Sequence, residues 1–212
     1  MNRRFLNHLA VSVLCGASAL LAMPAMAADE TADGLIKRLS TEVIDSIKAD
    51  KAIQAGDMSR VVALVDTKIM PNVNFQRMTA SAVGPGWRQA TPDQQKRLQE
   101  EFKTLLVRTY AGALAQVSDQ VIAVKPMRAG ADDTEVVVRT EVKGRGDSIQ
   151  LDYRLEKTAG QGAGWKIYNL NVLGVWLVET YKSQFAQEIN AKGIDGLIAT
   201  LADRNKANAK KS

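Results

Sequence analysis

A change in the spacing of apolar residues divides this chain into helical and strand regions. From Ile149 to Glu156 apolar and polar side chains alternate strictly. A period of two is typical of a strand with one buried and one wet face, as in antiparallel sheets. Residues 119–127, 134–143 and 164–172 show related strand patterns, and Gly144–Asp147 suits a hairpin turn. We therefore predict four antiparallel strands.

Helical spacing surrounds these strands on both sides. Helices are predicted over 31–52, 61–69, 74–83, 91–117, 175–191 and 194–206. Asn74 and Thr91 are suited to be N-caps, and Pro92 fits a first helical turn. The order helices, strands, helices predicts an α+β fold in which helices cover the apolar face of a curved sheet.

The N-terminus resembles a secretory signal. Arg3 and Arg4 precede an apolar run from Leu9 to Leu21, and "AMPAMA" ends in a small-x-small cleavage pattern. We expect residues 1–27 to be a signal peptide cleaved after Ala27, residues 28–206 to form one domain, and residues 207–212 to be a basic disordered tail. The apolar run is too short to span a bilayer as an anchor.

Cleavage of the signal peptide would remove cysteine and histidine from the chain. Cys15 is the only cysteine and His8 the only histidine, and both precede Ala27. A processed chain would then lack disulfides, thiol nucleophiles, Cys/His zinc sites and imidazole bases. The formal net charge of +5 is a mild excess, to which Arg3 and Arg4 contribute. It favours an acidic lipid headgroup or acidic partner and not nucleic acid.

Carboxylate catalysis is the remaining enzymatic alternative. Asp132–Asp133 is more typical of a turn, and Glu100–Glu101 of a solvated helix face. The predicted inward faces of the second and third strands carry no acidic residue. Acid–base chemistry needs titratable groups inside a pocket, so we expect a protein that is not an enzyme. The aromatic and aliphatic residues fit either a plain core or a cavity for acyl chains.

Three stretches together resemble a known family. They are "PNVNFQRMTASAVGPGWRQATPDQQKRLQEEFKTLLVRTYAGAL", "GWKIYNLNVLGVWLVETYKSQFAQEI" and "KGIDGLIATLADRN". In this order they are similar to the MlaC family of periplasmic phospholipid-binding proteins, also called toluene-tolerance auxiliary proteins. The resemblance implies an NTF2-like cone with a lipid-sized apolar pocket between sheet and helices.

The resemblance also implies a function. Family members shuttle phospholipid across the Gram-negative periplasm and maintain outer-membrane lipid asymmetry. The implied partners are an inner-membrane ABC transporter with an MCE subunit (MlaD type) and an outer-membrane lipoprotein–porin complex (MlaA type). Phospholipid would be cargo, with no cofactor or metal, and a monomer suffices. Alternatives are an NTF2-like lyase or isomerase, and a protein-binding accessory factor that never binds lipid.

By position, the resemblance implies which residues line the pocket. They are Val73, Phe75, Met78, Leu106, Tyr110, Val136, Val138, Leu151, Tyr153, Tyr168, Val172, Val175 and Trp176. Arg108 is implied to pair structurally or to approach a headgroup, and the structural role is favoured because a buried arginine is costly without a partner. Leu173 and Trp176 depart from the family pattern, which often has an acidic residue and a serine there. Both make the pocket rim more apolar.

Overall fold

The computed structural model describes residues 30–128, 130, 132–144, 146, 148–158, 160 and 162–209. The predicted signal peptide, with Cys15 and His8, lies outside these residues, as do Lys210 to Ser212. Three helices come first: α1 (Ala32–Ala49), α2 (Lys51–Gln54) and α3 (Met58–Leu64). A π-helical turn η1 (Val65–Ile69) and a 3-10 turn η2 (Met70–Asn72) follow, then α4 (Phe75–Val83), α5 (Gly86–Gln89) and α6 (Pro92–Ala115).

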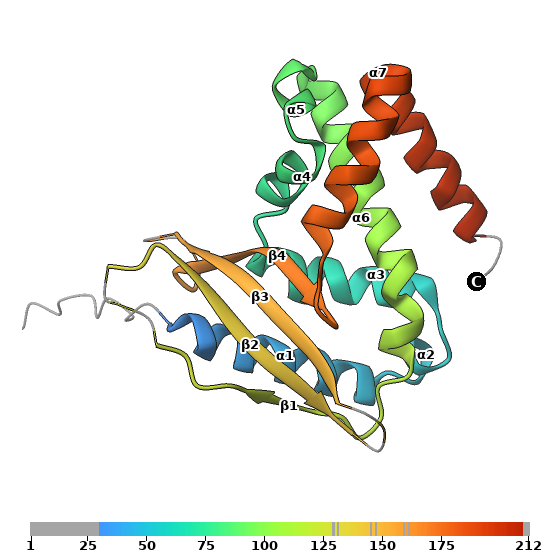
Figure 1. The fold of residues 1–212 in the computed structure, drawn as a ribbon. Helices are drawn as coiled ribbons and strands as arrows, with labels where there is room; N and C mark the ends of the chain where they lie inside the picture. The colour runs from blue at the N-terminus through green and yellow to red at the C-terminus, as the bar shows by residue number, and fades with distance from the viewer. Residues whose placement is uncertain are drawn as a thin grey trace, which may run out of the picture.

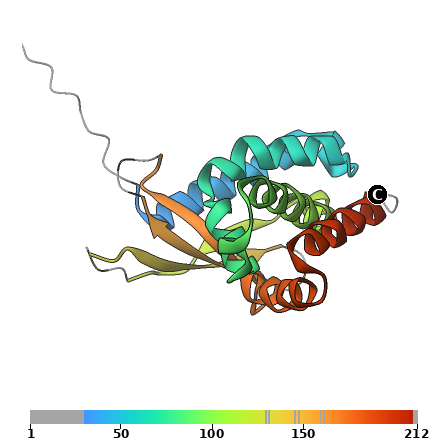
Figure 2. The ribbon, with the colours of Figure 1, turned by 90° about the horizontal axis from the view of Figure 1, so that it is seen from above.

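The sheet has five strands in sequential antiparallel order. They are β1 (Val121–Val124), β2 (Glu135–Lys143), β3 (Ile149–Lys157), β4 (Trp165–Val172) and β5 (Val175–Trp176). Figures 1 and 2 show α1 and α3 on one side of the sheet. We call the side that α1 covers the inner face and the opposite side the outer face. The predicted α+β class is confirmed, with five strands in place of four.

The fifth strand corrects the predicted start of the last helix. Val175 and Trp176 pair with Val172 and Asn171, so α7 (Leu177–Ala209) begins two residues later than predicted. Leu173 and Gly174 have φ values of 52° and 88°, which is the twist of a two-residue hairpin turn. This turn reverses the direction of the chain, so Val175 and Trp176 run back along β4 before α7 begins.

Gly193 interrupts α7 between the two helices predicted over 175–191 and 194–206. Its φ of 72° and ψ of −174° are not helical. Beyond it the chain packs against α6: Gln94 donates to Asp195 at 2.9 Å, and Asn205 donates to the Glu101 carbonyl at 2.9 Å. The helix continues to Ala209, past the predicted domain boundary at residue 206.

The helical core is organised around Phe102, which is fully buried. Its ring centroid lies 4.9 Å from that of Tyr181, 5.2 Å from that of Phe185 and 5.8 Å from that of Phe75. These aromatic contacts join α4, α6 and α7 into one layer. A second cluster packs α1 against the inner face, and a third joins α1, α2, α3 and α6.

A capping box begins α6, as predicted from Thr91. The Thr91 hydroxyl accepts from the Gln94 N–H at 3.2 Å, and the Gln94 side chain accepts from the Thr91 N–H at 2.9 Å. We expect Thr91→Ala to lower the free energy of unfolding by about 1 kcal/mol, because it leaves helical N–H groups without partners. Urea denaturation measures this. Thr41→Ala, in the exposed middle of α1, is the matched control and should change stability by less than about 0.5 kcal/mol.

Candidate functional site

The inner face of the sheet carries no carboxylate along its central strands, and Lys157, which pairs with Trp165, lies at its exposed end. Pairing of β2, β3 and β4 places on this face Val136, Val138, Thr140, Val142, Ile149, Leu151, Tyr153, Leu155, Trp165, Ile167, Leu170 and Val172. The outer face carries the charged residues Glu135, Arg139, Glu141, Asp152, Arg154 and Glu156. This segregation confirms the alternation predicted for the second and third strands, and it leaves the inner face without carboxylates.

A β-bulge in β4 changes which residues share the inner face. Leu155 pairs with Ile167, whereas Arg154 pairs with Asn169, so Tyr168 is an extra residue between them. Leu170 therefore points to the same face as Ile167, three positions earlier. The sequence contains a signal for this bulge, because its apolar positions change phase between Ile167 and Leu170.

Burial changes along the inner face. Val138 and Leu155, beneath α1, are fully buried. Further along the strands Leu151 and Val172 are only partly buried, and at the sheet end Ile149 is 42% exposed. Val175, which pairs with Val172, is 52% exposed. The same face therefore passes from a closed core to an accessible apolar surface.

The helices supply a second apolar wall next to this surface. Leu106 and Tyr110 of α6 are partly buried and pack in the same cluster as Leu170 and Val172 of β4. Phe75 also lies at the border of this cluster, and Met78 is buried within it. Val73 contacts both this cluster and the one beneath α1, because it forms a bridge with Ile167.

The polar groups of the inner face bond to one another. The Thr140 hydroxyl donates to the Leu151 carbonyl at 2.7 Å. Burial raises the pKa of Tyr153, while hydrogen bonds with Ser40 and Thr140 partly oppose the rise. A phenol with a raised pKa is neutral at physiological pH. The inner face thus offers a ligand a neutral surface suited to hydrocarbon.

Two predicted pocket residues lie on the outer face. Tyr168 donates to Glu135 at 2.9 Å, and the Arg77 guanidinium carbon lies 3.6 Å from its ring centroid. Trp176 pairs with Asn171, and the Arg154 guanidinium carbon lies 4.0 Å from its ring centroid. The structure therefore splits the predicted set, because the bulge and the β4–β5 hairpin turn these two rings away from Leu151.

Glu179 links the outer face to the first turn of α7. Its carboxylate accepts from Asn169 at 2.8 Å and pairs with Arg154. Burial raises the pKa of Glu179, but the hydrogen bonds from Asn169 and Arg154 outweigh it and hold the pKa below its ordinary value of 4.5.

This depressed pKa predicts acid sensitivity. The unfolded chain takes up a proton at Glu179 at a higher pH than the folded chain does, so the stabilisation is present above about pH 4.5 and is lost as the pH falls below it. We expect Glu179→Gln to show a shallower loss of unfolding free energy than wild type between about pH 5 and pH 3. Urea denaturation at several pH values measures this, and parallel curves for the two proteins would contradict it.

Arg108 lies on α6 and is partly exposed. Within the described residues it has no ion pair. The predicted alternatives, structural pairing and headgroup contact, both stay predictions.

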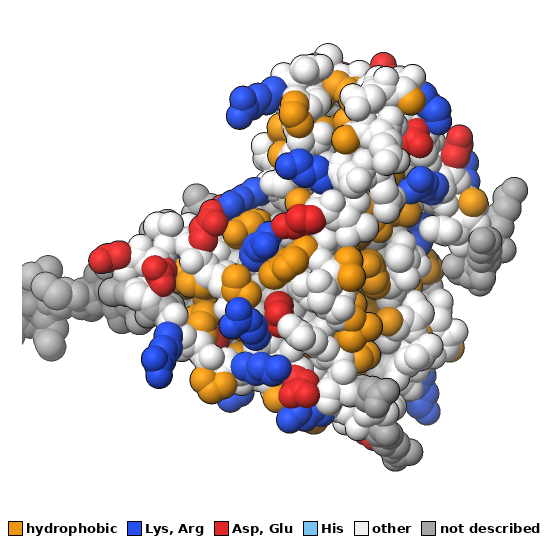
Figure 3. All heavy atoms as spheres, in the orientation of Figure 1, with side chains coloured by type: hydrophobic (Ala, Val, Ile, Leu, Met, Phe, Trp, Pro, Cys, Tyr) orange, Lys and Arg blue, Asp and Glu red, His pale blue; other side chains and the backbone are white. Residues whose placement is uncertain are grey.

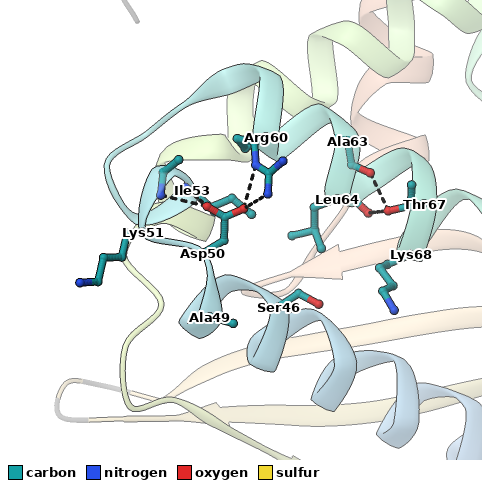
Figure 4. Close-up of a pocket in the computed structure, with 11 residues that line it drawn as sticks. Ser46, Ala49, Asp50, Lys51, Ile53, Arg60, Ala63, Leu64, Thr67 and Lys68 are labelled. Atoms are coloured by element: carbon teal, nitrogen blue, oxygen red, sulfur yellow. Dashed lines mark hydrogen bonds and ion pairs between the residues drawn. The ribbon is translucent and has the colours of Figure 1, made fainter.

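A surface hollow of about 790 Å³ lies between the end of α1, α2 and α3 (Figure 4). Asp50 accepts from the Ala52 and Ile53 N–H groups and pairs with Arg60 at 2.6 Å. Figure 4 shows this pair at one end of the hollow, with Lys51 directed away from it. None of the predicted pocket residues lines this hollow, and Asp50 serves there to cap α2.

Two features, a metal-holding cluster of side chains and a membrane-spanning helix, are absent from the described residues. They contain no group of three or more His, Cys, Asp or Glu side chains placed to hold a metal ion. No helix among them is both long and apolar enough to cross a membrane.

Comparison with known proteins decides the family. The family model described as MlaC protein matches residues 37–203. The chain belongs to the MlaC family. A curated relative is toluene tolerance protein ttg2D of Pseudomonas putida, which is 28% identical over 185 residues, covering 86% of this chain and 82% of that protein. The intermembrane phospholipid transport system binding protein MlaC of Haemophilus influenzae is 21% identical over 168 residues, covering 79% and 78%.

A solved structure from the same comparison shares the fold of this MlaC-family chain. It is the phospholipid-binding protein from Ralstonia solanacearum in complex with a phospholipid. The two superpose with a TM-score of 0.81 at 47% sequence identity, over 84% of this chain and 98% of that one. The name of the Haemophilus relative indicates phospholipid transport, that of the Ralstonia protein indicates phospholipid binding, and none of the three names a reaction.

Proposed function

We propose that this protein is a periplasmic phospholipid carrier that moves lipids between the outer and inner membranes and so maintains outer-membrane lipid asymmetry. The observation that carries the proposal is the apolar inner face, which carries no carboxylate and continues from a buried core to a half-buried surface at Leu151 and Val172. The similarity to a phospholipid-bound structure at 47% identity supports it.

The hydrophobic effect explains why such a surface suits acyl chains. Each methylene removed from water contributes about 0.8 kcal/mol, and a diacyl lipid has dozens of them. The polar side chains near Leu151, those of Thr140 and Tyr153, are neutral and hydrogen-bonded, so the transfer requires no charge to be desolvated there. We place the chains between the sheet residues Leu151, Tyr153, Leu170 and Val172 and the α6 residues Leu106 and Tyr110.

Some residues predicted from the sequence take a different place in this proposal. Val138 supports the face from beneath, since α1 already buries it fully. Tyr168 and Trp176 stand outside the proposed pocket, because their rings contact Arg77 and Arg154 on the outer face. Val175 is placed at its rim, where it is half exposed.

The N-terminal sequence favours export of the protein to the periplasm. Residues 1–27 have the order of charge, apolar run and cleavage pattern of a secretory signal. The family resemblance supplies the proposed partners: an MlaD-type subunit of an inner-membrane ABC transporter, and an MlaA-type lipoprotein–porin complex. We infer a carrier and not an enzyme, since the inner face presents no acid–base pair.

Native mass spectrometry of the protein expressed from its full sequence tests the proposal. We expect the folded chain to carry an added mass equal to a phospholipid, and organic extraction to release that lipid. The mass of the polypeptide also reports whether residues 1–27 have been removed. An empty folded protein that takes up no phospholipid from liposomes would show that the proposed function is wrong.

A further inference from the structure

A second surface hollow has a different chemical character from the inner face. It measures about 680 Å³ and lies between α4, α5 and the first part of α7. Its lining includes three cations, Arg77, Arg88 and Lys182, together with Ser81, Pro85 and Trp87. Figure 3 shows Lys and Arg side chains along the indentation between the helical lobe and the outer face of the sheet.

The turn from Gly84 to Gly86 builds one wall of this hollow. Gly84 has a φ of 68° and a ψ of −139°, a conformation that other residues avoid. At Gly86 the backbone approaches α7 so closely that an added Cβ would lie 3.1 Å from the Ile189 Cδ1 atom. The carbonyl of Trp87 accepts from the Gln95 side chain at 2.9 Å. Trp87 and Arg88 therefore extend from a fixed backbone.

The charges in the hollow are unbalanced. Arg77 is compensated, because it pairs with Glu135 and Glu156 on the outer face. Arg88 and Lys182 have no ion pair in the part of the chain that the structure describes, and no aspartate or glutamate lines the hollow. Two uncompensated positive charges within a concave surface attract an anionic group and strengthen its binding.

We propose that this hollow binds an acidic segment of a partner protein. Carboxylates of the segment pair with Arg88 and Lys182, and an apolar side chain of the segment packs on Trp87 and Pro85. A planar bilayer is a poorer fit, because Arg88 and Lys182 line a concave hollow between α4, α5 and α7. An ion of the size of inorganic phosphate fills little of 680 Å³ and gives the apolar ring of Trp87 nothing to pack against in the hollow.

This surface is separate from the proposed acyl-chain site. The residues that line it come from α4, α5 and α7, and none belongs to the inner face of the sheet. Charge changes at Arg88 and Lys182 should therefore leave bound phospholipid in place, so native mass spectrometry distinguishes failure of this proposal from failure of the proposed function.

The test uses a phage-displayed library of random heptapeptides, selected on the protein expressed from its full sequence. We expect enriched peptides to combine aspartate or glutamate with an apolar residue. Synthetic versions should bind the double variant Arg88→Glu, Lys182→Glu about tenfold more weakly or worse by fluorescence anisotropy. The matched control is Lys37→Glu with Lys51→Glu, which makes the same charge change at exposed residues of α1 and α2 and should bind as wild type does.

Four results would overturn the proposal. Enrichment of peptides without acidic residues is the first, and equal binding by wild type and the Arg88/Lys182 variant is the second. Complete displacement of the peptides by millimolar inorganic phosphate would assign the hollow to a small anion. Binding of phosphatidylcholine–phosphatidylglycerol vesicles that is lost in the double variant but not in the control would assign it to a membrane surface.

Discussion

The Leu151→Glu variant is expected to fold and to carry less than about a tenth of the phospholipid that the wild-type protein carries. Leu151 is partly buried and lies on the inner face between Thr140 and Val172. A carboxylate there must either lose its hydration or hold water where acyl chains would lie. Either costs several kcal/mol, and about 1.4 kcal/mol already corresponds to a tenfold loss of binding. Lipid content is measured by native mass spectrometry and by phosphate analysis of the extract.

Val137→Glu is the matched control for this prediction. Val137 is 36% exposed and lies on the outer face, opposite Arg154 of β3. The variant adds the same charge to a neighbouring strand, so it should retain wild-type lipid content. Equal loss in both variants, or full loading of Leu151→Glu, would show that acyl chains do not lie on the inner face. Val138→Glu is less informative, because Val138 is fully buried beneath α1 and a charge there would disrupt the core.

The largest loss of stability is expected from Phe102→Ala, which should reduce the free energy of unfolding by about 3–5 kcal/mol. Phe102 has no exposed surface and contacts the rings of Tyr181, Phe185 and Phe75. Its removal leaves a cavity where α4, α6 and α7 meet. Such a loss is a large share of the roughly 5–15 kcal/mol that stabilises a typical domain. Urea denaturation followed by circular dichroism measures it.

Phe75→Ala provides the comparison within the same aromatic cluster. Phe75 is partly exposed at the edge of the cluster, so its truncation leaves a smaller cavity and should cost clearly less than that of Phe102. If the two variants lose equal stability, the cluster is not centred on Phe102. Because Phe75 also lies toward the proposed lipid site, the measurements should be made on protein from which lipid has been extracted.

Local signals in the sequence were sufficient for most of the secondary structure. Thr91 and Asn74 cap α6 and α4 as predicted, because a capping side chain acts on N–H groups within three residues of itself. Alternation from Ile149 to Leu155 identified the two faces of β3, since its period is a direct property of the strand backbone. The two-residue strand β5 was missed, because its pairing depends on a reversal at Leu173 and Gly174.

The candidate site was only partly predictable. Leu106, Tyr110, Leu151 and Val172, which the family resemblance implied as pocket residues, lie on or beside the inner face. Leu170 was not among the predicted residues, and Tyr168 was assigned to the pocket. Both differences follow from one bulge, which shifts the side-chain phase of β4 within a single residue.

The sequence by itself determined the order of helices and strands, the absence of acidic residues on one strand face and the family to which the chain is similar. Each of these depends on residue types at short spacings. Only the tertiary structure decided that Tyr168 and Trp176 lie over arginines on the outer face, and that Arg88 and Lys182 approach one hollow from α5 and α7. These positions depend on strand register and on contacts between segments that lie far apart in the sequence, so they follow from the packing of the whole chain.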